Sequence, residues 1–204
     1  MVSPQDRMST EPAPGLYLDP DDRQRSLVED WERGPIELND VSQGLFFQNW
    51  KLTWESLTGN FVVTPQAFGF PTTVLFAIPG ITQCSFAFDK NGHVNVSYTS
   101  NGLPYLYWYD TVSAGWTTTA LPVTVNCPTL TLDDKRKMES ANNDIILWWT
   151  EYQITGNYTL YRALQRDRFS PLVPKLMQTG LPKNIFKCGM NTGLRVQLSL
   201  SNRN

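Results

Sequence analysis

The residues best suited to catalysis in this sequence are few and widely spaced. The single histidine, His93, follows Asn-Gly in a predicted hairpin turn, so a His-based triad would depend on a turn residue. There is no G-x-S-x-G nucleophile elbow, and the glycines lie in predicted turns instead of in a phosphate-binding pattern. The three cysteines and one histidine lack the spacing of a zinc motif. We therefore expect no metal site and no cofactor.

Paired carboxylates are the remaining route to catalysis, because a glycosidase needs only two. Asp133 and Asp134 end a predicted strand, where adjacent side chains point to opposite faces and cannot form a dyad. Asp133 also matches Asp89 in an internal repeat, and a turn-forming side chain explains that match better than catalysis does. The sequence therefore predicts that the protein is not an enzyme, and a glycan-degrading enzyme is the least favoured alternative.

Aromatic residues offer a different chemistry, which is stacking on sugar rings. The chain has 7 Trp, 8 Tyr and 10 Phe. A lectin built from repeats would place the same Trp in each copy, because each copy would form one equivalent site. Here Trp108 aligns with Arg162, and Trp116 has no Trp counterpart. A carbohydrate-binding module with glycan contacts at Trp108 and Trp116 is therefore an alternative function and not the favoured one.

An internal repeat organises the middle of the chain. One copy begins at Cys84 and reads CSFAFDKNGHVNVSYTSNGLPYLYWYD; the second begins at Cys127. The two cysteines occupy matching places, and each copy continues with an alternating strand that ends on an acid. Repeats of this length are typical of propellers and stacked meanders. We expect two related meanders, residues 84–126 and 127–182, which are too few to close a ring alone. They would stack on a third layer from residues 45–78 or be completed by neighbouring subunits.

The rest of the pattern predicts an all-β fold, with antiparallel β-meanders that form a sandwich or propeller-blade-like body over residues 44–204. Two Asn-Gly pairs, at Asn91 and Asn101, signal tight hairpin turns. Strict alternation over residues 194–200 predicts a half-buried C-terminal strand. No strand–helix–strand alternation is present, which excludes a parallel α/β sheet.

Residues 1–43 are expected to form an extended N-terminal arm with one short helix. The helix is predicted over about residues 20–33, because Asp19 is a suitable N-cap, Pro20 fits the first helical position, and Gly34 follows as a stop. Its apolar residues form one narrow stripe: Leu27, Val28 and Trp31. Such a stripe is suited to docking on a larger body, either its own or a neighbour's.

The charge of the chain limits the classes of partner that we expect it to bind. A net charge of −2 and a pI of about 5.4 provide no bulk attraction to nucleic acid. Residues 1–34 have a net charge of −4 and the remainder +2. Arg166 and Arg168 share one face of a predicted strand edge, where they are candidates to bind a neighbour's acidic arm. No apolar run is long enough to cross a membrane and no signal-peptide pattern is present, so we expect folding in a reducing cytoplasm.

Several segments together resemble the virion structural proteins of tailed bacteriophages. They are QGLFFQNWKLTWES, SFAFDKNGHVNVSY, LYWYD, LTLDDKR, NDIILWW and LYRALQRDRF, followed by CGMNTGLRVQLSL, and they span residues 43–204. The resemblance implies a tail component of the adaptor, hub, collar or fibre-attachment type. It implies a β-rich homo-oligomeric ring that contacts other phage tail proteins, located in the virion tail after assembly in the host cytoplasm. It supplies no catalytic residues.

Overall fold

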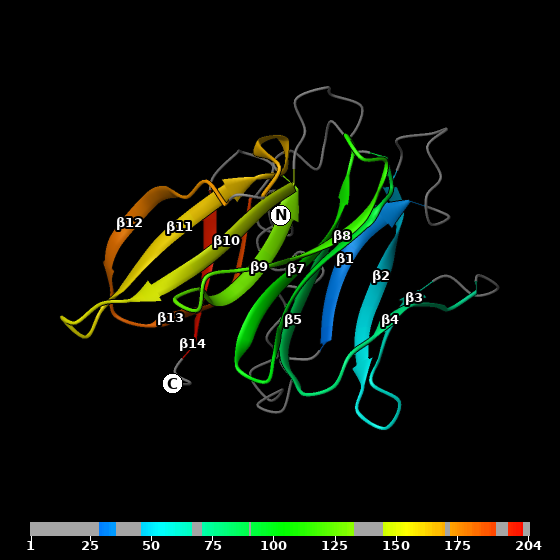
Figure 1. Cartoon of the computed structure of the whole chain (residues 1–204), viewed down its shortest axis with the longest axis horizontal. Coiled ribbons are helices and arrows are strands. Elements are labelled where there is room, and N and C mark those ends of the chain that lie inside the picture. Colours follow the sequence, from blue (N-terminus) through cyan, green and yellow to red (C-terminus); the bar gives the residue numbers. More distant parts are fainter. Residues whose placement is uncertain are drawn as a thin grey trace, which may run out of the picture.

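The computed structural model describes residues 29–35, 46–66, 71–89, 91–132, 145–169, 172–190 and 196–201 of the chain. Within these residues the fold is all β apart from one 3-10 turn, as the sequence predicts. Three sheets have four antiparallel strands each and a fourth has two (Figure 1).

Each sheet is a meander, because within a sheet every strand after the first pairs with the strand that precedes it in the chain. Sheet A contains β1 (Glu29–Pro35), β2 (Phe46–Glu55), β3 (Asn60–Pro65) and β4 (Thr73–Ala77). Sheet B contains β5 (Ile81–Phe88), β6 (Val94–Ser100), β7 (Leu103–Asp110) and β8 (Gly115–Ala120). Sheet C contains β9 (Asn126–Leu132), β10 (Ile145–Tyr152), β11 (Tyr158–Leu164) and β12 (Lys175–Leu181), with the 3-10 turn η1 (Gln165–Asp167) after β11. Sheet D contains β13 (Asn184–Met190) and β14 (Val196–Ser201).

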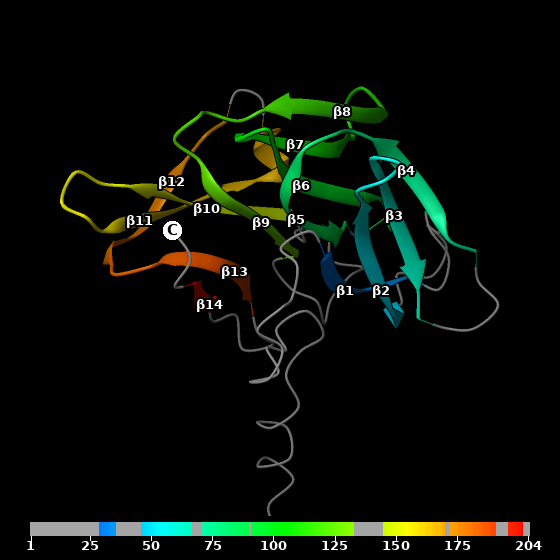
Figure 2. The same ribbon diagram turned by 90° about the horizontal axis from the view of Figure 1, so that it is seen from below.

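The first strands of the four sheets lie side by side. β1 packs against β5, β5 against β9, and β9 against β13, while the later strands of sheets A to C fan outward to β4, β8 and β12 (Figure 2). The blades of a β-propeller are arranged around their axis in the same way. Among the described strands, β13 and β1 lack the close packing that joins the other successive pairs. The described strands of the four sheets therefore form an arc whose ends, β1 and β13, do not pack closely on each other; we call this the open arc.

Tight turns join the strands as the sequence predicts. Asn101 and Gly102 have φ values of 49° and 79° and connect the paired residues Ser100 and Leu103. Left-handed conformations at both central positions match the twist of the flanking strands, which is why Asn-Gly is favoured there.

Apolar side chains fill the spaces between neighbouring sheets. The core between sheets A and B includes Trp50, Phe61 and Phe86, all buried. The core between sheets B and C includes Trp108 and Trp149. A third cluster lies on the opposite face of sheet C: Ile146, Trp148, Leu160 and Leu181. Sheet C is thus apolar on both faces, as a sheet between two others must be.

The helix predicted over about residues 20–33 is wrong in its C-terminal part. Residues 29–35 form β1, which pairs with β2 from Glu29 opposite Thr53 to Pro35 opposite Phe46. Pairing with β2 and packing against β5 outweigh the local capping signals, since helix propensity is a weak preference that tertiary contacts override. These residues therefore belong to the body and not to the arm. The remainder of that prediction, including Leu27 and Val28, lies outside the described residues.

The two predicted meanders are sheets B and C, and sheet A is the third layer beside them. The two cysteines follow matching pairs, since Gln83 before Cys84 lies opposite Thr99 and Asn126 before Cys127 lies opposite Thr150. Cys127 has a φ of 49°, and the pairing of β9 with β10 shifts register between Trp148 and Thr150. An extra residue in a β-bulge causes such a shift. Two residues, Cys127 and Pro128, therefore lie opposite Trp149, whereas Cys84 alone lies opposite Tyr98, so the two copies differ by one position beyond the cysteines.

Candidate functional site

The segment after β11 attaches sheet C to sheet B. The Arg168 guanidinium donates a 2.5 Å hydrogen bond to Asp110 Oδ2 at the end of β7. The Gln165 side-chain amide donates a 3.1 Å hydrogen bond to the Tyr109 carbonyl. The buried Phe169 ring meets the Trp108 ring edge to face, with centroids 5.5 Å apart. We call these contacts the β7 clamp, because three residues of one segment bind three successive residues of β7.

The clamp changes the titration of Asp110. Burial alone would raise the pKa of this carboxyl, but hydrogen bonds from the Val112 N–H, the Arg168 guanidinium and the Ser113 hydroxyl act in the opposite direction. Together with the positive charge of Arg168, they hold the pKa of Asp110 below its ordinary value. The carboxylate is therefore ionised at neutral pH and attracts the guanidinium.

The position of the two arginines differs from the prediction. β11 ends at Leu164, and residues 165–167 form η1, so Arg166 and Arg168 do not share a strand face. Arg168 lies beyond the turn in a left-handed conformation, with a φ of 66°. Its acidic partner is Asp110 of the same chain. The sequence identified this charged segment, but nothing in it indicated that the partner was at the end of LYWYD.

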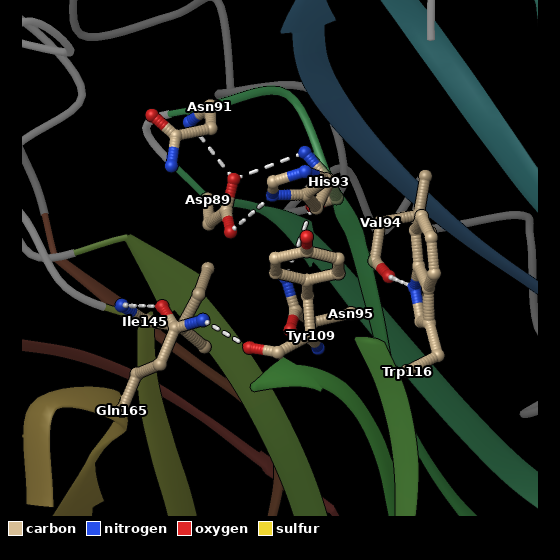
Figure 3. A network of polar contacts seen from close by, with 9 residues as sticks. All are labelled: Asp89, Asn91, His93, Val94, Asn95, Tyr109, Trp116, Ile145 and Gln165. Carbon is tan, nitrogen blue, oxygen red and sulfur yellow. Dashed lines mark hydrogen bonds and ion pairs between the residues drawn. The ribbon is translucent and has the colours of Figure 1, made fainter. Parts of the chain in front are cut away.

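A second polar network surrounds the turn between β5 and β6 (Figure 3). Asp89 Oδ1 accepts hydrogen bonds from the backbone N–H groups of Asn91 and His93, at 2.8 and 3.0 Å. Asp89 Oδ2 lies 2.9 Å from His93 Nδ1. This is the turn-forming role that the repeat predicts for Asp89, and it is confirmed. Asp133, the matching residue, lies outside the described residues.

His93 belongs to an aromatic patch together with Tyr107, Tyr109 and Trp116. The His93 ring stacks on Tyr109 with centroids 3.7 Å apart and planes 11° apart. The Trp116 indole meets both rings edge to face and donates a 3.2 Å hydrogen bond from Nε1 to the Val94 carbonyl. Tyr107 lies nearly parallel to Trp116. Trp116 is 42% exposed, so part of the residue is accessible from solvent.

Trp108, the other predicted glycan contact, is a core residue. Its side chain is 2% exposed, packs against Phe169 and donates a 3.0 Å hydrogen bond to Thr119 Oγ1. A ligand cannot reach it without unfolding the clamp. The strand alternation of β7 explains the difference, because Tyr107 and Tyr109 face the patch while Trp108 faces sheet C.

A buried serine joins three sheets at their inner strands. The Ser85 hydroxyl on β5 donates a 2.9 Å hydrogen bond to Asp30 Oδ2 on β1 and accepts a 3.2 Å hydrogen bond from the Leu130 N–H on β9. The same Asp30 oxygen accepts the Phe86 N–H at 2.9 Å. Asp30 and Ser85 are 6% and 1% exposed. We call this the Ser85 junction; sequence analysis missed it, because both residues are common and lie 55 positions apart.

Sheet C carries the most exposed apolar surface near the open end of the arc. Every residue of β12 from Lys175 to Gly180 is exposed. In β8, the corresponding outer strand of sheet B, exposed residues alternate with half-buried ones. The exposed large apolar residues of sheet C and its connections are Tyr152, Ile154, Val173, Leu176 and Met177. They are distributed over both ends of the sheet, since Leu176 pairs with Tyr161 while Tyr152 and Ile154 lie at the turn that follows β10.

Two further features bear on chemistry. Burial raises the pKa of the Cys127 thiol to about 11, although hydrogen bonds with the Gln83 and Asn184 side chains act against this shift. The thiol is therefore protonated at neutral pH and is a poor nucleophile. A shallow recess of about 340 Å³ lies at the turn end of sheet A beside Trp54, whose Nε1 already donates to the Gly59 and Ile78 carbonyls.

Within the described ranges, no group of three or more His, Cys, Asp or Glu side chains is placed to hold a metal ion. The described part of the chain also contains no helix long and apolar enough to cross a membrane.

Trp31, the predicted docking residue, lies on β1 opposite Lys51.

None of the protein-family models, curated proteins or solved structures compared with this chain matches it.

Proposed function

We propose that this protein is a structural component of a bacteriophage tail, of the oligomeric adaptor or hub type, which acts by protein–protein contact during virion assembly. The observation that carries the proposal is the open arc. Sheets A to C are joined by hydrogen bonds at the Ser85 junction and the β7 clamp, while sheet D has two described strands. A scaffold with one unfinished side is suited to binding a neighbour.

The surface beside the open end supports the same proposal. Leu176 and Met177 on β12 are 55% and 37% exposed, and Ile154 in the turn between β10 and β11 is fully exposed. Covering such side chains removes apolar area from water, which favours association. The resemblance of residues 43–204 to virion proteins supplies the biological setting, and the arc supplies the means of assembly.

The test is the location of the protein in virus particles. Antibodies raised against the purified chain should label the tail of intact particles made by cells that express its gene. Particles from a virus that lacks the gene should have incomplete tails, and the purified protein should restore them. Complete, infectious particles without the chain would contradict the proposal.

Carbohydrate binding at the tail tip is a second candidate, because Trp116 is partly exposed beside three other rings. Trp116→Ala should abolish binding to a glycan array if this function is correct. Tyr152→Ala is the matched control, since Tyr152 is an exposed aromatic residue of sheet C outside the patch. No binding by the unaltered protein to host-surface glycans would remove this candidate.

A further inference from the structure

We propose that the outer edge of β14 binds residues 8–22 of a second copy of this chain and so extends sheet D. The inference rests on the proposed function, because it names the contact by which copies assemble. Its basis is the combination of a sheet with two described strands, an exposed flank and complementary charge.

The acceptor is the side of β14 away from β13. β14 pairs with β13 from Ser201 opposite Asn184 to Val196 opposite Met190, and no other described strand pairs with its second edge. Sheets A, B and C each have four strands. Backbone donors and acceptors at an unpaired strand edge are a template for strand addition from another chain.

The flank of this acceptor is also uncovered. In the arc, β13 packs against β9 of sheet C, in the way that β9 packs against β5. Further strands on sheet D would therefore extend alongside the outer strands of sheet C. The outermost of these, β12, exposes every residue from Lys175 to Gly180. Added strands would cover this surface and remove apolar area from water.

Charge favours an acidic occupant. From residue 168 to residue 204 the sequence contains no Asp or Glu, and its basic residues are Arg168, Lys175, Lys183, Lys187, Arg195 and Arg203. Residues 8–22 contain no Lys or Arg, and their acidic residues are Glu11, Asp19, Asp21 and Asp22. Complementary charge accelerates encounter and disfavours wrong partners. A second β14 is a less favoured occupant, because Arg195 and Arg203 on either side of the uncharged strand would approach their copies in the partner.

The acidic segment also has the composition of an edge strand. Leu16, Tyr17 and Leu18 form an apolar run, bounded by Pro14 and Pro20. Proline lacks a backbone N–H and is tolerated in sheets at edges and strand ends, so the run can supply only a short outer strand. β4, the outer strand of sheet A, is similarly short at five residues.

A second copy is the favoured source, because a closed ring repeats one head-to-tail contact around its axis. The same segment folding back onto its own β14 would produce a closed monomer. Both arrangements use the same strand pairing, but only pairing with a second copy gives a complex heavier than one chain. The experiment must therefore measure the molar mass in solution.

The test is a charge exchange in the full-length protein, followed by light scattering over a concentration series. One variant carries Asp19→Lys, Asp21→Lys and Asp22→Lys, and another carries Lys175→Glu and Lys183→Glu. The unaltered chain should form a defined oligomer, each variant should lose it, and the variant with all five substitutions should regain it. A monomeric unaltered chain, a charge variant that still assembles, or a variant with all five substitutions that stays monomeric overturns the proposal.

Proline substitution tests the edge itself. The N–H groups of neighbouring residues in a strand point in opposite directions, so of Gln197→Pro and Leu198→Pro, one removes a hydrogen bond to β13 and the other an outward N–H. The variant that keeps the melting temperature should still lose the oligomer; an intact oligomer in that variant contradicts the edge assignment.

A monomer that is nonetheless found in phage tails overturns this inference alone, whereas an oligomer absent from particles overturns only the proposed function.

Discussion

The Arg168 guanidinium and the Asp110 carboxylate form a 2.5 Å hydrogen bond between residues that lie 58 positions apart. Asp110 ends β7 of sheet B, and Arg168 follows the turn after β11 of sheet C. The ion pair therefore fixes the angle between two sheets near their outer half, as the Ser85 junction fixes it at their inner strands. The two sheets are thus linked at two separate places along their strands.

Asp110→Asn should lower the free energy of unfolding at neutral pH. It should also make the free energy of unfolding less dependent on pH in the acid range. The pKa of Asp110 is lowered in the folded protein, so its contribution to stability is present above the ordinary value of 3.8 and is lost as the pH falls through the lowered value. Urea unfolding at a series of pH values measures this. Asp167→Asn is the matched control, because it removes the same charge from an exposed residue of η1. Equal acid dependence in the two variants would contradict the role given to Asp110.

Ser85→Ala should destabilise the protein by about 1–3 kcal/mol, because it leaves the Leu130 N–H without an acceptor and removes one donor from the buried Asp30. Chemical denaturation gives the free energy of unfolding. Ser56→Ala, in the exposed turn after β2, should change it by less than about 0.5 kcal/mol. If the two variants were equally stable, the junction would not hold the sheets together.

Phe169→Ala should cost about 3–5 kcal/mol, since the ring is fully buried against Trp108 and its removal leaves a cavity. Near-ultraviolet circular dichroism should change as well, because Trp108 loses its edge-to-face partner. Ile154→Ala, at a fully exposed position, is the control and should leave both measurements unchanged. A small effect at Phe169 would show that the segment after β11 is not anchored as described.

Two truncations should separate the arm from the body. Removal of residues 1–28 should leave a chain that melts cooperatively, because β1 and the contact of Asp30 with Ser85 remain. Removal of residues 1–35 also deletes β1, exposes the edge of β2 and leaves β5 uncovered. That chain should melt at a much lower temperature in circular dichroism. Identical melting of both truncations would contradict the placement of β1 in the body.

The sequence predicted the strands and turns well where local signals agree with pairing. Asn101-Gly102 forms the expected tight turn, and the side chains of Tyr105, Tyr107 and Tyr109 alternate with buried residues along β7. The helix prediction was wrong at residues 29–33, where Gly34 and the preceding cap signals favoured a helix. Pairing with β2 decided the structure there, and such long-range contacts leave no local signal.

The candidate site was less predictable than the fold. The charged segment that contains Arg166 and Arg168 was identified, but a single sequence does not indicate which carboxylate a guanidinium will meet. Trp108 and Trp116 were grouped as glycan contacts, although strand alternation places one in the core and the other on the surface. The Ser85 junction depends on three strands from three sheets, so only their packing reveals it.

The most direct test of the proposed tail function is cross-linking mass spectrometry on intact, purified virus particles. The account predicts peptides of this chain in those particles, cross-linked to tail proteins. Recovery of the chain only from the soluble fraction of infected cells, with none in complete particles, would contradict it.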